Sequence, residues 1–254
     1  MALQLSWIDV ELTQYLGVSL VSLPLLLLPG SLCNEQLFRQ QISFFIRQRE
    51  VIVADFSGCD SIESMAIKVL DEAPAEFALV GFSMGGIVAF EMFRQAPERI
   101  KKVALIGTSP RAESPERVII RNQQINGIVE RGVEGLKALV RQALLPKYVF
   151  DTEQSLRIES VVMEMALDAG PDVFIDQWRA LANRTESWTT LKDIHCPTLI
   201  LCGVHDLLCD EKCHRDMALN IKHASLEIIE GAGHLSTLDA PEQVNRALDS
   251  WLNP

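Results

Sequence analysis

The sequence has little positive charge, no long uninterrupted apolar run and no internal repeat. Its 23 lysines and arginines face 34 aspartates and glutamates, which gives a net charge of −11. A surface this acidic is a poor partner for nucleic acid or for an anionic membrane. The most apolar stretch, residues 16–30, is broken by Pro24 and Pro29 and is too short to span a bilayer. We therefore expect no nucleic-acid partner and no membrane partner.

The sequence also lacks the basic residues that open a secretory leader. Asp9 and Glu11 stand before the apolar stretch, where a leader carries positive charge. A chain of 254 residues does not need disulfides to hold a core together. We therefore expect its six cysteines to be reduced thiols and the protein to be cytoplasmic.

Several thiols and imidazoles lie close together in the sequence without a recognised metal-binding spacing. They are Cys202, His205, Cys209, Cys213 and His214. Zinc sites usually show paired cysteines or histidines at fixed short intervals, and this set shows none of them. Free cysteine is also among the most buried residue types. We therefore predict that these cysteines are buried thiols and that the protein binds neither a metal nor an organic cofactor.

What the sequence does contain is an alternation of apolar runs and amphipathic segments. Six short runs end in glycine or aspartate: LPLLLLPG, VIVADFSG, FALVG, VALIGTS, PTLILCG and LEIIEGAG. Such runs are typical of strands that a parallel sheet buries on both faces. Helical periods separate them at residues 34–48, 61–73 and 241–252. The alternation predicts an α/β fold, with a mostly parallel sheet of six to eight strands flanked by helices.

The alternation stops once, over residues 111–191. This segment contains four amphipathic helical stretches and no convincing strand, and it is too long for an ordinary connection. It predicts a helical cap inserted into an α/β core made of residues 1–110 and 192–254. Residues 3–12 are compatible with an additional edge strand.

The stretch ALVGFSMGGIVAFE, residues 78–91, changes its apolar period at Ser83. A strand period precedes the serine and a helix period follows it. Gly81 and Gly85 flank it at two residues on either side, as a sharp strand-to-helix turn requires. Such a turn lifts the hydroxyl clear of the sheet, so Ser83 is the predicted nucleophile. A glycine-rich packing turn is the alternative.

A serine hydroxyl needs a base to accept its proton and an acid to orient that base. His234 follows the last apolar run, at the sheet edge expected for Ser83, and is the predicted base. Asp206 and Asp210 both follow the preceding run. Asp206 is closer to the strand end, whereas Asp210 is placed to cap the next helix. Asp206 is therefore the predicted acid.

The oxygen that becomes negative during acyl transfer needs N–H donors. Met84 directly follows the nucleophile at a helix N-terminus and is the first predicted donor. Ser31 is the second, because Gly30 lets the backbone turn toward the site, and Leu32 is the alternative. A cap over the site must turn apolar side chains toward it, and Trp178 and Leu32 are the predicted pocket residues.

Four stretches together resemble the α/β-hydrolase superfamily: LPGSLCNEQLF, VGFSMGG, PTLILCGVHDLLC and GAGHLSTLDAPEQVNRALDSWL. They are similar to its small capped esterases, enol-lactonases and the pimeloyl carrier-protein methyl esterase. The resemblance covers residues 24–110 and 190–253 and implies the Ser–His–Asp triad and a helical cap. Where many relatives have His-Gly, this chain has Pro29-Gly30. It also lacks the H-G-x-G-P-G run of carbon–carbon bond hydrolases, and Ser83 replaces the Asp of dehalogenases and epoxide hydrolases.

These features predict a serine hydrolase that cleaves a small carboxylic ester through an acyl-enzyme. Thioesterase, lactonase or perhydrolase action would use the same triad, and a non-catalytic small-ligand receptor can retain it. The cap is expected to set acyl preference, with short to medium uncharged acyl groups favoured. Its arginines are expected on solvated helix faces, and contact with an anionic carrier or a substrate carboxylate is the alternative: Arg117, Arg121, Arg131, Arg141 and Arg157. A carrier-protein partner is an alternative that no residue specifically supports.

Overall fold

The computed structural model describes residues 22–150 and 154–253, and in this part of the chain six strands form one parallel sheet. The order across the sheet is β2-β1-β3-β4-β5-β6. The strands are β1 (Leu25–Leu28), β2 (Val51–Val53), β3 (Phe77–Phe82), β4 (Ile100–Ile106), β5 (Thr198–Gly203) and β6 (Ala224–Ile229). The predicted α/β fold and parallel sheet are confirmed. Residues 3–12, the suggested edge strand, lie outside the described residues.

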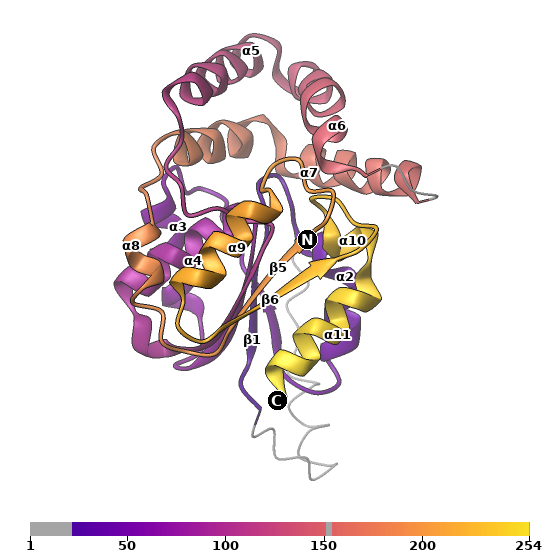
Figure 1. Cartoon of the computed structure of the whole chain (residues 1–254). Coiled ribbons are helices and arrows are strands. Elements are labelled where there is room, and N and C mark those ends of the chain that lie inside the picture. Colours follow the sequence, from indigo (N-terminus) through magenta and orange to yellow (C-terminus); the bar gives the residue numbers. More distant parts are fainter. Residues whose placement is uncertain (1–21, 151–153, 254) are drawn as a thin grey trace.

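Helices cover both faces of the sheet (Figure 1). On one face lie α3 (Ile62–Glu72), α4 (Met84–Gln95), α8 (Trp188–Leu191) and α9 (Glu211–Asn220). On the other lie α2 (Arg39–Phe45), α10 (Ser236–Asp239) and α11 (Pro241–Leu252), and the short helices η1 (Glu35–Phe38) and η2 (Pro97–Arg99) complete the connections. Strands β1, β3 and β5 are therefore buried along their whole length, whereas edge strand β6 alternates between half-buried and exposed up to its buried last residue, Ile229.

Local sequence explains where several of these helices begin. Ser61 and Ser64 form a reciprocal capping box at the start of α3, which satisfies N–H groups that the first turn leaves unpaired. Pro241 occupies the first turn of α11, where its missing N–H costs nothing. Val244 and Leu248 then form a fully buried stripe toward the sheet.

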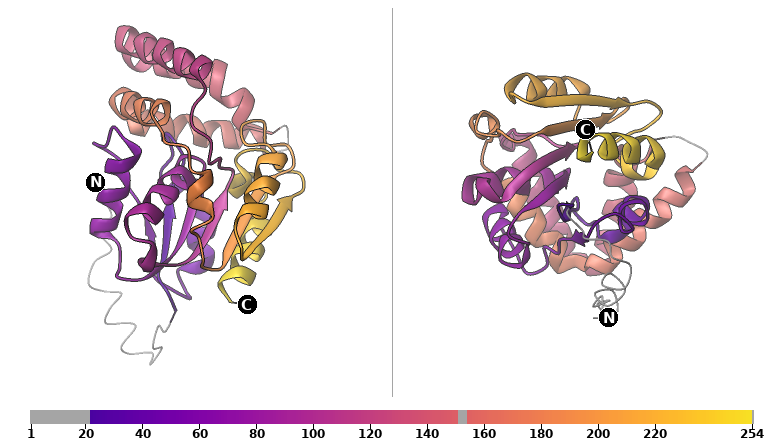
Figure 2. Two further views of the ribbon diagram at one scale, coloured as in Figure 1. Left: turned by 60° about the vertical axis from the view of Figure 1, so that its left-hand side comes forward. Right: turned by 90° about the horizontal axis from the view of Figure 1, so that it is seen from below.

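The remaining helices lie together beyond the carboxyl ends of the strands (Figure 1). They are α5 (Pro115–Leu139), η3 (Val140–Leu144), α6 (Leu145–Tyr148) and α7 (Ser155–Ala182). In the turned view of Figure 2 they stay on the side of the sheet opposite the C-terminus. Gly132 and Gly170, with φ of 54° and 79°, interrupt α5 and α7. The division into a core and a cap at residues 111–191 stays a prediction.

None of the helices in residues 22–150 and 154–253 is both long enough and apolar enough to cross a membrane.

Candidate active site

Ser83 lies between β3 and α4 in a backbone conformation that side chains rarely adopt. Its φ is 51° and its ψ is −111°. Such a conformation is strained and persists only where neighbouring groups hold it. The Ser83 N–H donates to the Ile106 carbonyl at 2.9 Å, and the Ser83 carbonyl accepts the Thr108 hydroxyl at 2.7 Å. The turn is thus fixed from β4 and from the loop that follows it.

Three glycines let the chain segments approach closely at this turn. A Cβ on Gly81 would lie 2.7 Å from the Gly85 carbonyl oxygen, and a Cβ on Gly85 would collide with the Leu28 backbone. A Cβ on Gly86 would lie 2.5 Å from the Thr108 side chain. Any side chain at these positions would force α4 away from the strands and displace the nucleophile turn.

The structure brings the side chains of Ser83, His234 and Asp206 together. His234 Nε2 lies 3.1 Å from Ser83 Oγ, and His234 Nδ1 lies 2.9 Å from Asp206 Oδ2. The three residues follow β3, β6 and β5, so three strand ends supply one constellation. The His234 and Asp206 side chains are 2% and 0% exposed. Two hydrogen bonds in series of this kind allow a proton to move from the serine hydroxyl to the imidazole.

The second oxygen of Asp206 is held by the backbone. Asp206 Oδ1 accepts the Leu208 N–H at 2.8 Å and the Cys209 N–H at 3.0 Å. Burial opposes the ionised form, but the His234 ring and these two amides outweigh it and lower the pKa of Asp206. The carboxylate is therefore charged and fixed in orientation at neutral pH.

Asp210, the alternative acid, lies at the start of α9 and not at the serine. Its carboxylate accepts the Cys213 N–H at 2.7 Å, which makes it the helix N-cap that the sequence predicts. Its carbonyl accepts the His214 Nδ1–H at 2.9 Å, while His214 Nε2 accepts the Thr108 N–H at 3.2 Å. Burial lowers the pKa of His214, which keeps the ring neutral. His214 thereby supports Thr108, which holds the Ser83 carbonyl.

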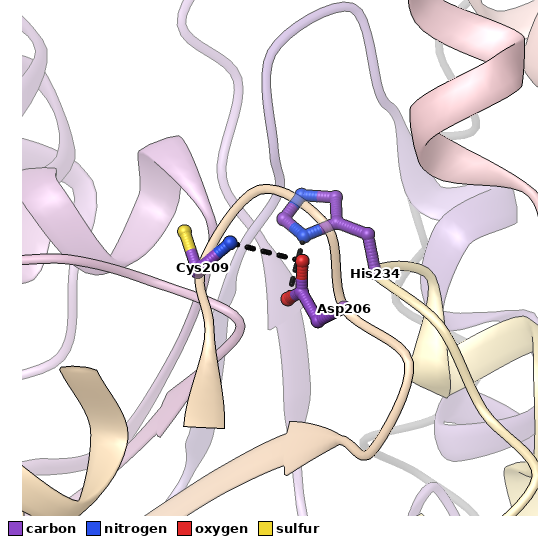
Figure 3. Close-up of side chains that lie close together, drawn as sticks. All are labelled: Asp206, Cys209 and His234. Atoms are coloured by element: carbon purple, nitrogen blue, oxygen red, sulfur yellow. Dashed lines mark hydrogen bonds and ion pairs between the residues drawn. The ribbon is translucent and has the colours of Figure 1, made fainter. Parts of the chain in front are cut away.

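Cys209 lies beside the Asp206–His234 pair (Figure 3). One ligand-type atom from each of the three residues lies within 4.8 Å of the others, a spacing that would also suit a metal ion. A cysteine binds metal as the thiolate. Burial raises the pKa of the Cys209 thiol well above its ordinary value, which disfavours that form. The Asp206 carboxylate is already engaged by His234 and by backbone amides. We therefore interpret the group as a hydrogen-bonded set.

Activity is expected to survive prolonged dialysis against EDTA, because Asp206 and His234 already bond each other and the Cys209 thiol is disfavoured as a thiolate. Cys209→Ser, which keeps the backbone N–H bonded to Asp206, is expected to retain most of the activity. Elemental analysis of the purified protein supplies the check. Stoichiometric zinc that is lost together with activity would contradict this interpretation.

The loop after β1 carries the two candidate oxyanion donors. Leu32 has a φ of 57°, and its N–H donates to Gln177 Oε1 of α7 at 2.7 Å. Because that N–H is engaged, Ser31 is the better candidate of the two. Met84 is the first residue of α4, where N–H groups have no partner within the helix. Ser31 and Met84 both line the cavity beside Ser83.

This cavity has a volume of about 450 Å³ and lies between the nucleophile turn and helices α5, η3, α6 and α7. Trp178, the predicted pocket residue of the cap, is among its lining side chains. Leu32, the other predicted pocket residue, is not; its side chain is buried in the core. The cavity volume suits a small molecule.

Cationic side chains dominate the charged lining of the cavity. They are Arg111, Arg117, Arg121, Lys147 and Arg184, against the single carboxylate of Glu113. The prediction that the cap arginines are solvated is wrong for Arg121, whose side chain is only 10% exposed. It is incomplete for Arg117, which is half-exposed yet lines the cavity. The other three arginines are exposed, as predicted: Arg131, Arg141 and Arg157.

Sequence reasoning missed two residues that meet the site from α6 and α7. The Tyr148 ring centroid lies 5.4 Å from that of His234, and its hydroxyl hydrogen-bonds Ser31. Burial raises the pKa of Tyr148 to about 12, so this hydroxyl stays neutral. Gln177, which holds Leu32, is 4% exposed. A polar residue on an apolar helix face was the available signal for Gln177, whereas Tyr148 lies in a short connection with no period to read.

Asp239 supports the loop that carries His234. Its Oδ2 accepts the Gly233 N–H at 2.9 Å, and its buried Oδ1 has no hydrogen-bond partner among the described residues. Burial raises the pKa of Asp239 from 3.8 to about 6, against the opposing effects of the Gly233 N–H and of His234. Above that pH the fold therefore holds a poorly solvated charge.

Asp239→Asn is expected to raise the melting temperature relative to the wild type at pH 8, and the difference is expected to shrink toward pH 4. The native pKa is raised, so the native state holds this proton while the unfolded state releases it between pH 3.8 and about 6. The contribution of the carboxyl to stability is therefore greatest below pH 3.8 and lost as pH rises through about 6. The asparagine oxygen can still accept the Gly233 N–H.

Thermal unfolding of both proteins across this pH range checks the expectation, with Asp71→Asn on an exposed position as the matched control. A difference that does not change with pH would show that the pKa of Asp239 is the same in the native and unfolded states.

A family model described as the alpha/beta hydrolase fold matches residues 54–241, which include the nucleophile turn and both partner loops. The chain belongs to the α/β-hydrolase fold family. Esterases, other hydrolases and lactonases are among its relatives and structural neighbours.

Two curated relatives of this α/β-hydrolase cover most of its length. It is 25% identical over 252 residues to the (E)-2-((N-methylformamido)methylene)succinate hydrolase of Acinetobacter baylyi, with 90% of each chain covered. It is 24% identical over 199 residues to the pimeloyl-[acyl-carrier protein] methyl ester esterase of Aromatoleum aromaticum, which covers 72% of this chain and 76% of that protein.

Solved structures agree with this assignment. A thermophilic esterase from Thermogutta terrifontis, with malate bound, superposes with a TM-score of 0.81 at 25% identity and covers 91% of this chain and 89% of its own. The enol-lactonase from Burkholderia xenovorans superposes with a TM-score of 0.80 at 20% identity. The superposition covers 93% of this chain and 94% of the enol-lactonase. At that identity the second likeness concerns the fold alone.

Proposed function

We propose that this α/β-hydrolase is a serine hydrolase that cleaves a small carboxylic ester through an acyl-enzyme. The observation that carries the proposal is the hydrogen-bond chain from Ser83 Oγ through His234 to Asp206, at 3.1 Å and 2.9 Å. Ser83, the first residue of this hydrogen-bonded series, lines a cavity of small-molecule size. Fold alone would not support an activity, whereas a nucleophile, its base and the orienting acid in contact do.

The two half-reactions follow from the geometry. Ser83 Oγ attacks the ester carbonyl as its proton moves to His234 Nε2, and Asp206 stabilises the imidazolium through Nδ1–H. The Met84 and Ser31 amides are placed to donate to the oxyanion. Collapse of the tetrahedral intermediate releases the alcohol, which takes the proton from His234. Water then repeats the sequence on the acyl-enzyme, and the carboxylic acid leaves.

The relatives support hydrolysis, and one of them supports ester cleavage in particular. One is named for hydrolysis of a substituted succinate and another for a methyl ester of a carrier-bound acyl chain. We carry only this class to the present chain, because identity near 25% does not transfer a substrate.

A fluorophosphonate probe combined with a substrate panel tests the proposal. Labelling of the wild type and turnover of p-nitrophenyl esters are expected. Faster turnover of matched thioesters or lactones than of esters would reassign the reaction to thioesterase or lactonase action. Failure of labelling, together with tight binding of a small molecule, would favour a non-catalytic receptor.

Trp178 is proposed to set acyl preference, and Trp178→Ala is expected to change it. The indole lines the cavity, stacks on Phe174 at 4.2 Å between ring centroids, and donates to Gln124 at 2.7 Å. Removing it opens volume that longer acyl chains can fill. Relative kcat/KM across a C2-to-C10 ester series is expected to change more than tenfold, about 1.4 kcal/mol of differential transition-state binding.

Trp188→Ala is the matched control, because Trp188 is half-buried in α8 and is not among the residues that line the cavity. Its chain-length profile is expected to follow the wild type. A uniform drop for Trp178→Ala across the whole series would mean that Trp178 only holds the cap together.

A further inference from the structure

Three arginines of the cap converge on one buried carboxylate at the cavity. The Glu113 side chain is 1% exposed. Arg117 Nε lies 3.0 Å from Glu113 Oε1, Arg121 Nε 2.6 Å from Oε2, and Arg184 Nη2 3.5 Å from Oε1. All four residues line the cavity that Ser83 also lines. We call Arg117, Arg121 and Arg184 with Glu113 the arginine cluster.

The arginine cluster carries more positive charge than its own carboxylate neutralises. Three guanidinium groups around one carboxylate leave an excess of two positive charges. The pKa of Arg184 is lowered by burial and by the neighbouring Arg121 and Arg117, while Glu113 acts in the opposite direction. Arg111 and Lys147 line the same cavity and add to the excess. This concentration occurs in a chain whose net charge is −11.

The arginine cluster also has N–H donors that the Glu113 carboxylate does not use. Arg117 and Arg121 contact Glu113 through Nε, and no hydrogen bond from their terminal Nη groups to another described residue is found. Arg121 lies over the Trp178 ring, 5.1 Å from its centroid, which fixes the plane of the guanidinium. A purely structural clamp on Glu113 would need one arginine, because a guanidinium can satisfy both oxygens of a carboxylate.

We propose that the arginine cluster binds a carboxylate of the substrate, so that the enzyme acts on esters that carry a second, anionic carboxyl group. This inference rests on the proposed ester hydrolysis and narrows its substrate class to half-esters of small dicarboxylic acids. It replaces the preference for uncharged acyl groups that the sequence suggested. Ser83 and the arginine cluster border one cavity of about 450 Å³, which limits the acid to a short chain.

The test compares two esters that differ only at the far end of a six-carbon acyl chain: mono-p-nitrophenyl adipate and p-nitrophenyl hexanoate. The wild type is expected to show a kcat/KM at least tenfold higher for the adipate half-ester, and the preference should weaken with added salt. Arg117→Gln and Arg121→Gln are each expected to lower this ratio roughly tenfold, mainly through KM, since charge-assisted hydrogen bonds are lost.

Two further variants separate substrate binding from a structural role. Glu113→Gln removes the competing negative charge and is expected to raise the adipate-to-hexanoate ratio, whereas loss of a structural ion pair would lower both activities together. Arg131→Gln makes the same change of charge on an exposed part of α5 outside the cavity and is expected to leave the ratio unchanged. Circular dichroism verifies that each variant is folded.

A binding measurement keeps this inference distinct from the proposed function. Calorimetric titration of Ser83→Ala with monomethyl adipate is expected to show binding that Arg117→Gln weakens roughly tenfold, whether or not the wild type turns over either ester. Absence of turnover alone would overturn ester hydrolysis. Equal preference for the two esters, with no binding of monomethyl adipate, would overturn the carboxylate site while ester hydrolysis stands.

Discussion

Ser83→Ala is expected to abolish ester turnover and fluorophosphonate labelling while the fold remains intact. The hydroxyl is the group placed 3.1 Å from His234 Nε2, and alanine supplies neither a nucleophile nor a proton. Loss of the nucleophile in other serine hydrolases costs roughly 10⁶-fold in kcat. Alanine tolerates the positive φ at this position about as poorly as serine does, so the backbone should change little.

Ser109→Ala is the matched control for this experiment, because Ser109 lines the same cavity from the loop after β4. It is expected to keep its labelling by the probe. The melting temperatures of both variants should lie near that of the wild type. Undiminished labelling of Ser83→Ala would show that the nucleophile lies elsewhere.

The nucleophile turn was predictable from the sequence because its determinants are local. A change of apolar period and the glycines around Ser83 lie within a few residues of each other, and the close contacts of Gly81 and Gly85 explain why glycine stands there. The six strands were predictable for a similar reason, since each lies in an apolar-rich run ended by a turn residue, although the edge strands β2 and β6 are only partly buried. His234 followed from one topological rule, that parallel strands end at the same edge.

The environment of the site depends on contacts between distant segments and could not be read in the same way. Gln177 reaches Leu32 across 145 residues of sequence. Arg184 donates to the Glu113 carboxylate across 71 residues of sequence. Arg121 lies on the buried face of α5 together with Ile125 and Ile128, and it lines the cavity instead of facing the solvent. Its partner Glu113 is buried as well, and no local pattern indicates that this arginine and this carboxylate meet there.

Asp206→Asn is expected to lower kcat by roughly 10³–10⁴-fold, the loss seen when the orienting acid of other triads is neutralised. The geometry supplies the reason. Asp206 Oδ1 accepts two backbone N–H groups, from Leu208 and Cys209. An asparagine side-chain oxygen would accept the same two N–H groups. Its NH₂ group would then face His234 Nδ1, which must become an acceptor. The ring proton moves to Nε2, the atom that has to accept the Ser83 proton.

Asp210→Asn separates this effect from a general loss of charge near the site. Asparagine caps a helix about as well as aspartate, so the Cys213 N–H keeps its partner and α9 keeps its start. Its kcat is expected to stay within a few-fold of the wild type, because Asp210 does not contact His234 through its carboxylate. Single-turnover kinetics of both variants with one activated ester measure the acylation step directly. If Asp210→Asn slows acylation more than Asp206→Asn does, then the residue that orients His234 is not the one bonded to it in this structure.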